Sequence, residues 1–266
     1  MVQCYNLGKK LENISRLDAK LMKKLSITII TKNEEKNIAR CLESVKWADE
    51  IVVLDTNSTD RTVEICRQFT DKVFCLNWHG YGKQKNLCAE RTSHNWILNV
   101  DSDEVISSEG AEEIRTILRD EPKHPVYQFP RKNFFGQHWV RYGGWYPDRI
   151  SRLYDKTQVS FTESQVHDKL FPDGNIGSMK SAIFHYSFSG MADYIARQNH
   201  YSTLYAREKV DQGFHASWSH LLLRPPATFL KNFIIRQGFR DGFLGLFLAL
   251  SSAFYTFLKY AKTKSI

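Results

Sequence analysis

The chain has 266 residues, of which 42% are hydrophobic and 25% are charged, and its formal net charge is +8. This composition excludes a disordered chain, and the length suffices for one large domain with a full core. The five cysteines (Cys4, Cys41, Cys66, Cys75 and Cys88) show no C-x-x-C spacing. They argue against a zinc site or a disulfide framework, and we expect reduced thiols in a cytosolic compartment.

The positive charge is concentrated at the two ends of the chain. Residues 1–24 carry net +4 and residues 201–266 carry net +6, which leaves −2 for residues 25–200. Basic ends favour an anionic partner, either membrane lipid or nucleic acid. Residues 1–24 are predicted to form a basic helix or extension, and without an apolar segment there we expect no secretory signal.

Apolar runs and helical patterns alternate over residues 25–110. The runs at 25–31, 50–55, 72–76 and 96–101 are predicted strands, and helical spacing follows the first three of them. This alternation predicts βαβ units, and therefore an α/β fold with a mostly parallel sheet and flanking helices.

Polar residues follow three of these strands, at Thr31 to Glu34, Asp55 to Asp60 and Asp101 to Asp103. The carboxyl ends of parallel strands form the ligand edge of such a sheet. In a doubly wound fold this edge binds a nucleotide. The glycine-rich loops that usually bind nucleotide phosphates are absent, so a cation and basic side chains must neutralise the charge of a nucleotide diphosphate. Two carboxylates in Asp-x-Asp suit Mg²⁺ or Mn²⁺. The candidate basic residues are Lys83, Lys85, Arg149 and Arg152.

Short strand-like segments at 126–130, 149–154 and 183–186 are interpreted as the acceptor half of the same domain. The intervening loop holds Trp139, Trp145 and Tyr146, whose rings suit either stacking on a sugar or core packing. Helical patterns follow from residue 191, and Arg224-Pro225-Pro226 is predicted to interrupt them.

Residues 25–34, 53–60, 84–86 and 101–103 together resemble a family 2 glycosyltransferase of the GT-A (Rossmann-like) fold. Later segments resemble the lipopolysaccharide-core branch, which includes β-1,4-glucosyltransferases that act on inner-core heptose. These segments are 143–148, 152–154 and 166–168. The chain departs from the usual motifs at Thr56, in place of a second aspartate, at Lys85, in place of arginine, and at Asp168, in place of glutamate.

The resemblance implies that Thr31, Glu34 and Asp55 contact the uracil and ribose of a UDP-sugar, with Lys85 nearby. Asn33, which can also cap the following helix, is counted with them. It further implies that Asp101 and Asp103 hold the ribose and the metal–diphosphate, where the metal is Mg²⁺ or Mn²⁺.

The family inverts the anomeric carbon, and inversion needs a carboxylate that takes the acceptor proton. We favour Asp168 as this base, with Glu163 as the alternative. His167 and His185 are read as metal ligands, acceptor contacts or structural histidines. We count His167 with Trp145 and Tyr146 as acceptor residues, and His185 as a candidate metal ligand.

Residues 242–258 are uncharged and are flanked by basic residues. Seventeen residues lie at the lower limit for spanning a bilayer, so we predict amphipathic helices that lie in the interface of an anionic membrane. A buried core helix is the alternative. Nucleic acid is not an expected partner, because few charges are interleaved with many aliphatic residues.

The predicted organisation is a basic extension (1–24), a catalytic domain (25–190) and a helical membrane-association region (191–266). The catalytic domain divides into a nucleotide-sugar half (25–110) and an acceptor half (111–190). The predicted protein is a peripheral or monotopic enzyme on the cytoplasmic face of a bacterial inner membrane. It moves glucose or a similar hexose to a lipid-linked saccharide, the lipopolysaccharide inner core. The alternatives are a polyprenyl-phosphate glycosyltransferase and a non-catalytic membrane-attached scaffold.

Overall fold

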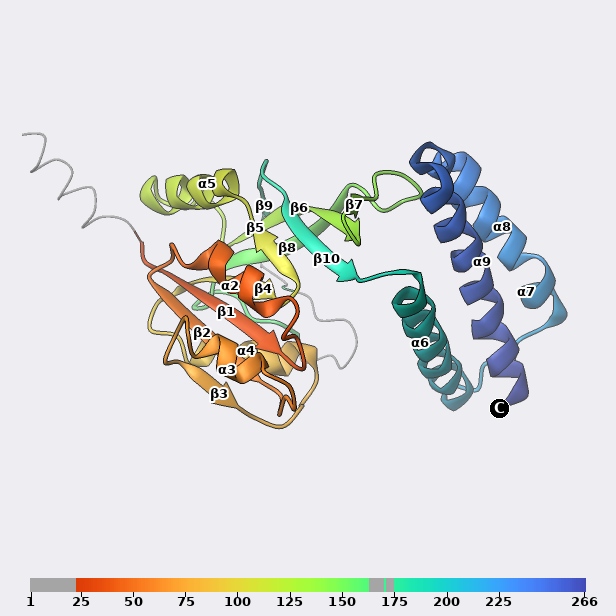
Figure 1. The fold of residues 1–266 in the computed structure, drawn as a ribbon, viewed down its shortest axis with the longest axis horizontal. Coiled ribbons are helices and arrows are strands. Elements are labelled where there is room, and N and C mark those ends of the chain that lie inside the picture. Colours follow the sequence, from red (N-terminus) through yellow and green to blue (C-terminus); the bar gives the residue numbers. More distant parts are fainter. Residues whose placement is uncertain (1–22, 163–169, 171–174) are drawn as a thin grey trace, which may run out of the picture. The chain divides into compact units, whose positions relative to one another are not determined.

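The computed structural model describes residues 23–162, 170 and 175–266. The predicted N-terminal helix, together with Glu163, His167 and Asp168, lies outside the described residues. The chain forms two compact units (Figure 1). Unit 1 runs to Pro130 and includes Arg149–Ile183, and unit 2 consists of Arg131–Asp148 and Phe184–Ile266. The expected acceptor half therefore contributes residues to both units.

The sheet of unit 1 begins with four parallel strands, as predicted. They are β1 (Leu25–Thr31), β2 (Glu50–Asp55), β3 (Val73–Cys75) and β4 (Trp96–Asp101). Strand β1 pairs in parallel with both β2 and β4, and β2 pairs in parallel with β3. Strand β8 (Asp148–Asp155) then joins β4 in the antiparallel direction, which gives the order β3-β2-β1-β4-β8.

The remaining strands are shorter or are shared between the two units. They are β5 (Glu104–Ile106), β6 (Val126–Phe135), β7 (His138–Trp139), β9 (Gly177–Ser178) and β10 (Ile183–Phe188). Strands β6, β8 and β10 contain the three strand-like segments that the sequence predicts, and β5 was not predicted. Within unit 2, β7 pairs with the end of β6 through Phe134 and Phe135.

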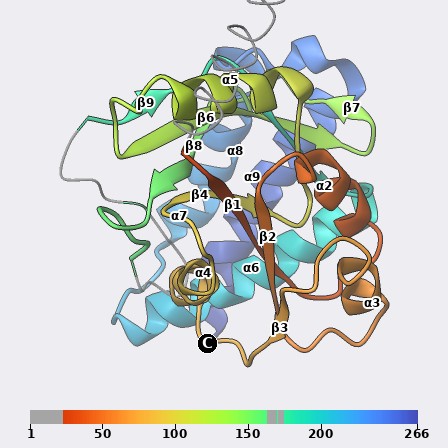
Figure 2. The ribbon, with the colours of Figure 1, turned by 90° about the vertical axis from the view of Figure 1, so that its left-hand side faces the viewer.

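Helices cover both faces of the parallel strands because alternate side chains of a strand point to opposite faces. Leu25, Ile27 and Ile29 pack in the core cluster that also holds residues of α2 (Ile38–Val45) and α5 (Ser108–Arg119). On the other face, Val52 and Leu54 pack with Cys88. Cys88 belongs to α4 (Tyr81–Glu90), which β1 and β2 separate from α2 and α3 (Thr62–Cys66) in Figure 2. Helix α5 was not predicted, although Ser107 caps it by accepting from the Gly110 N–H.

Unit 2 is mainly helical. Its helices are α6 (Met191–Asp211), α7 (Trp218–Leu222), α8 (Arg224–Leu230), η1 (Lys231–Ile235), η2 (Gly238–Asp241) and α9 (Gly242–Ser265). Helix α9 packs between α6 and α8 (Figure 1). The predicted interruption falls between α7 and α8, because Pro225 and Pro226 occupy the first turn of α8, where their missing N–H groups leave no hydrogen bond unmade.

Two further expectations concern the cysteines and the C-terminal helix. The four described cysteines are free thiols, and only Cys75 is exposed. Residues Gly238–Ser265 are, by length and composition, apolar enough to cross a membrane. Only 28% of the 18-residue apolar stretch within them is buried inside the protein, so most of it is accessible. The C-terminal helix is thus a candidate for association with a membrane.

Candidate active site

Strands β1, β2 and β4 end at one edge of the sheet, where Thr31 lies opposite Asp55 and Ile30 opposite Asp101. Thr31 is 4% exposed, and its hydroxyl has no hydrogen-bond partner in the part of the chain that the structure describes. The buried carboxylate of Asp55 accepts hydrogen bonds from the Ser58 N–H (2.7 Å) and hydroxyl. A buried hydroxyl without a partner is rare in proteins, and a ligand bound at this edge could supply the missing hydrogen bond.

The loops that follow β1 and β2 are braced against each other. The Asn33 N–H donates to the Ser58 hydroxyl (2.8 Å), and the Asn33 side-chain oxygen accepts from the Thr59 N–H (2.8 Å). The Glu34 N–H donates to the Thr62 hydroxyl at 2.7 Å. Asn33 has a φ of +54°, which asparagine tolerates better than most residues. The bracing holds two of the predicted nucleotide-binding residues at this edge.

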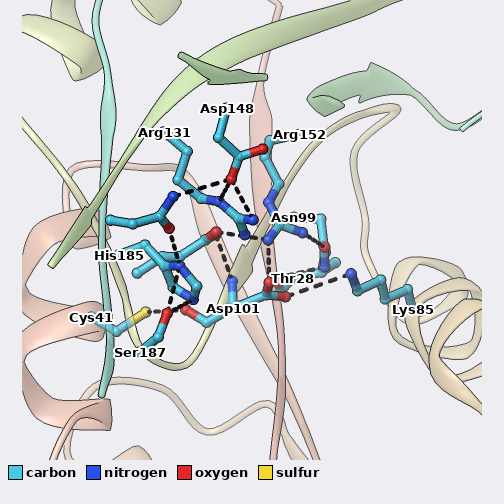
Figure 3. Close-up of polar contacts among 12 residues, drawn as sticks. Thr28, Cys41, Lys85, Asn99, Asp101, Arg131, Asp148, Arg152, His185 and Ser187 are labelled. Carbon is cyan, nitrogen blue, oxygen red and sulfur yellow. Dashed lines mark hydrogen bonds and ion pairs between the residues drawn. The ribbon is translucent and has the colours of Figure 1, made fainter. Parts of the chain in front are cut away.

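Asp101, the last residue of β4, lies between two cations. Lys85 of α4 places its ammonium 3.5 Å from Oδ1, and Arg152 of β8 donates to Oδ2 (Figure 3). Lys85 is 5% exposed, and its Nζ also lies 5.1 Å from the centre of the Phe161 ring. Both oxygens of Asp101 are therefore neutralised by residues that come from other elements.

Arg152 is the centre of a buried polar network in unit 1. Only 1% of the side chain is exposed, and its guanidinium donates to Asn99 Oδ1 (3.0 Å) and to Glu104 Oε1 (2.8 Å). The other oxygen of Glu104 accepts from the Asp101 N–H at 3.1 Å. Burial alone lowers the pKa of Arg152, but Asp101 and Glu104 outweigh it and raise the pKa. This burial favours Arg152 as a residue that holds Asp101 in place over one that meets a diphosphate directly.

Cys41 completes the surroundings of Asp101. Its thiol donates to the Asp101 carbonyl at 3.4 Å. Burial first, and then the nearby Glu104, Asp103 and Asp101 carboxylates, raise the pKa of this thiol well above its ordinary value, so it stays a protonated donor. Sequence reasoning did not single out Asn99, Glu104 or Cys41 for this site. The available signals were a polar residue inside an apolar strand and a glutamate directly after Asp-Ser-Asp.

Comparison with known proteins bears on this arrangement. The model described as "Glycosyl transferase family 2" matches residues 26–172, which is more than half of the chain. The chain belongs to glycosyltransferase family 2. The predicted GT-A fold and glycosyltransferase activity are confirmed by this membership.

Several relatives align along almost the whole of this glycosyltransferase. An uncharacterized glycosyltransferase of Rickettsia typhi is 34% identical, over 92% of this chain and 88% of its own length. The lipopolysaccharide core biosynthesis glycosyltransferase LpsC of Rhizobium meliloti is 29% identical, over 90% and 91% respectively. Among solved structures, S. aureus TarS 1–349 in complex with UDP is 20% identical with a TM-score of 0.48, over 91% of this chain and 90% of that chain.

The carboxylates of this glycosyltransferase suit a particular kind of metal site. Within residues 23–162, 170 and 175–266, no group of three or more His, Cys, Asp or Glu side chains is arranged to hold a metal ion. Mg²⁺ and Mn²⁺ are commonly bound by one or two carboxylates together with substrate phosphates and water. Asp101 and Asp103 are the two carboxylates of the Asp-x-Asp motif that could take part in such a site, and Asp101 also faces Lys85 and Arg152.

The other predicted site residues belong to both units. Lys83 and Arg149 are exposed on unit 1. In unit 2, His185 Nδ1 lies 2.7 Å from Asn133 Oδ1 and 2.7 Å from the Ser187 hydroxyl (Figure 3). Trp145 packs with Phe188 and Tyr194 in a hydrophobic cluster, and Tyr146 contacts the Trp139 ring edge-on. The roles assigned to these residues, and to Glu163, His167 and Asp168 outside the described residues, stay predictions.

Proposed function

We propose that this glycosyltransferase moves glucose or a similar hexose from a UDP-sugar to the heptose of the lipopolysaccharide inner core, with inversion. The observation that carries the proposal is the edge of β1, β2 and β4, where a buried unpaired hydroxyl, two buried cations and Asp-x-Asp lie together. The acceptor is inferred from the name of LpsC, a relative along nearly the whole chain.

In this proposal the donor lies along the carboxyl edge of the sheet. Thr31 and Asp55 contact the uracil and ribose, and the unpaired Thr31 hydroxyl gains a partner when the nucleotide binds. Asp101 receives the ribose hydroxyls, held in place by Lys85 and Arg152. Asp103 binds Mg²⁺ or Mn²⁺, which when bound neutralises the charge that develops on the leaving diphosphate.

The chemical step is a single displacement. An acceptor hydroxyl oxygen bonds to the anomeric carbon, the bond from that carbon to the diphosphate oxygen breaks, and UDP leaves. The hydroxyl proton passes to a carboxylate of the chain. We assign this base to Asp168, with Glu163 as the alternative.

We further propose that the enzyme works on the cytoplasmic face of a bacterial inner membrane. The apolar C-terminal helix and the lipid-linked nature of the proposed acceptor support this location. A single apolar helix flanked by basic residues suits a protein that is bound to one leaflet.

The donor site is tested by calorimetry with UDP and Mn²⁺ on two variants of the same strand. Thr31→Val removes the unpaired hydroxyl, so we expect unchanged thermal stability and about tenfold weaker UDP binding. Thr28→Val is the matched control on the same strand, because the Thr28 hydroxyl, unlike that of Thr31, has a partner within the protein. It accepts a hydrogen bond from Asn99 Nδ2 at 3.2 Å. We expect this control to lose stability. Unchanged UDP affinity of Thr31→Val, or no binding of UDP by the wild type, would reject the proposed donor site.

Donor and acceptor are assigned by turnover. UDP-glucose, UDP-galactose and GDP-mannose are compared as donors, with core saccharide that lacks the hexose as the acceptor, and we expect transfer from a UDP-hexose and none from GDP-mannose. Transfer to polyprenyl phosphate instead of the core saccharide would keep the donor site and replace the proposed acceptor.

A further inference from the structure

The turn between α8 and α9 exposes large apolar side chains. We call residues 231–243 the hairpin tip. Ile235 and Phe243 are 75% and 73% exposed, and Ile234 and Phe239 are 52% and 50% exposed. Single exposed apolar residues are ordinary, but four within ten residues form a patch that marks contact with another apolar surface.

The turn itself is tightly built. A Cβ on Gly245 of α9 would lie 1.8 Å from the Gly238 carbonyl oxygen, so η2 rests directly on the α9 backbone. The Gly143 N–H donates to the Arg236 carbonyl at 2.9 Å. The exposed apolar side chains are therefore carried by a tightly packed backbone and not by a flexible loop.

Helix α9 is not arranged as a lone membrane span. Its inner side packs on α6, where Lys262 Nζ donates to the Asn199 carbonyl (2.8 Å) and the Ser202 hydroxyl (2.8 Å). Helix α6 also carries Arg197, paired with Asp193 at 2.9 Å. If α9 crossed a bilayer, these charged and polar groups would enter the hydrocarbon at high cost. The hairpin is therefore suited to enter one leaflet only.

The hairpin tip and the rest of the C-terminal segment carry an excess of positive charge. Residues 212–266 contain seven Lys or Arg and a single acidic residue, Asp241. The Asp241 carboxylate accepts from the backbone N–H groups of Arg141 (3.1 Å) and Tyr142 (2.8 Å). Lys231, Arg236 and Arg240 are exposed beside the apolar patch. This charge complements anionic lipid headgroups.

A segment about one hundred residues earlier in the chain contributes to the same place. Within residues 139–144, the Arg141 guanidinium lies 4.4 Å from the centre of the Trp139 ring. The guanidinium of Arg240, in the hairpin tip, lies 4.4 Å from the centre of the Tyr142 ring. Gly144 has φ +91°, a backbone conformation that favours glycine, and the Arg236 side chain lies directly against it, since a Cβ there would lie 2.4 Å from Arg236 Nη1. Aromatic rings with Lys and Arg are typical of the membrane–water interface.

We propose that the hairpin tip inserts into one leaflet of an anionic membrane as a single docking element with residues 139–144. Ile234, Ile235, Phe239 and Phe243 enter the acyl region. Arg141, Arg236 and Arg240 bind lipid phosphates at its rim. The inference rests on the membrane location in the proposed function and adds the point of insertion and the chemistry of the partner.

The test is flotation of the full-length chain with vesicles of phosphatidylcholine, with and without phosphatidylglycerol. We expect binding only to the anionic vesicles, and weaker binding at high salt. Ile235→Glu, and separately Phe239→Ser, should each weaken binding by about tenfold. Phe257→Glu, at the far end of α9 and 40% exposed, is the matched control and should bind nearly as the wild type does.

The cationic part is tested by Arg141→Glu, which we expect to weaken binding by roughly fivefold to tenfold. Arg67→Glu, an exposed arginine of unit 1, is the control for net charge. Equal losses in Phe257→Glu and Ile235→Glu would reject insertion at the tip. Equal losses in Arg67→Glu and Arg141→Glu, or equal binding to both vesicle types, would reject the phosphate contacts. UDP calorimetry needs no membrane, so a chain that binds UDP but no vesicles overturns this inference alone.

Discussion

The two units depart from ordinary burial in opposite directions. At the ligand edge of unit 1, polar and charged side chains such as Asp55, Glu104 and Arg152 are almost completely buried. In unit 2, large apolar side chains such as Ile235 and Phe243 are mostly exposed. Burial of charge and exposure of apolar surface are both unfavourable, so each needs a physical reason.

The contrast agrees with the partner that we propose for each unit. Unit 1 pairs the buried Glu104 carboxylate internally with Arg152, and the Thr31 hydroxyl is one of several buried polar groups there without a partner among the described residues, which suits a polar ligand held in a fixed orientation. Unit 2 pairs the Asp241 carboxylate with backbone N–H groups and exposes large apolar side chains, which suits an apolar environment. A substitution among the buried polar groups of unit 1 should therefore affect the fold or the transfer reaction. A substitution among the exposed apolar side chains of unit 2 should leave both nearly unchanged.

The largest effect is expected from Asp103→Ala. Loss of the carboxylate that we assign to the cation should lower the transfer rate by about 10³-fold. The melting temperature should stay within about 2 °C of the wild type, because Asp103 lies in the turn after β4 and outside the core cluster. Steady-state transfer assays and thermal scans measure the two properties. Asp120→Ala, at an exposed position that ends α5, is the control, and near-normal transfer by Asp103→Ala would contradict the metal assignment.

Arg152→Met should have the largest effect on stability. It leaves Asp101 and Glu104 as neighbouring carboxylates without their shared cation, so we expect a loss of about 3–5 kcal/mol in the free energy of unfolding. Urea titration measures this quantity. Arg149→Met, three residues earlier and exposed, should change it by less than about 0.5 kcal/mol. A loss below about 1 kcal/mol for Arg152→Met would show that the network is not a structural requirement.

A smaller effect is expected from pH, through Glu50 in unit 1. Burial raises the pKa of Glu50, but Lys72, Ser26 and Ser93 outweigh it and lower the pKa to about 2. A carboxylate with a lowered pKa stabilises the fold above its unfolded value of 4.5, and this stability is lost as the pH falls towards 2. We expect a contribution of about 2 kcal/mol, reduced from the full shift because Lys72 is partly exposed. If Glu50→Gln kept the same acid dependence in urea titrations, another carboxylate would be responsible.

The smallest effect is expected at the hairpin tip of unit 2. Ile235→Ser and Phe243→Ser should change the free energy of unfolding by no more than about 0.5 kcal/mol, since both side chains lie mostly in solvent. Leu98→Ala in the core of unit 1 should cost about 3 kcal/mol in the same urea titration. A large loss from either tip variant would mean that these side chains support the fold, and the contrast between the units would then disappear.

The sequence by itself determined the parallel strands and most helices. Strands β1, β2 and β4 are apolar runs followed by polar residues, and this pattern is local, so it is legible without the tertiary structure. The ligand edge follows from the same pattern, because parallel strands bring their carboxyl ends together. The Asp-x-Asp motif was therefore located by sequence, although α5 was missed despite its Ser107 cap.

Only the tertiary structure decided which distant residues share one environment. Arg152 reaches Asp101 because β8 pairs antiparallel with β4, with Leu98 opposite Leu153, and no local pattern encodes that register. In the same way, Asp241 binds the backbone at Arg141 across one hundred residues of chain. Local patterns report the preference of a segment for helix or strand. The partner of a buried charge is set by packing between segments, and that packing is a property of the whole fold.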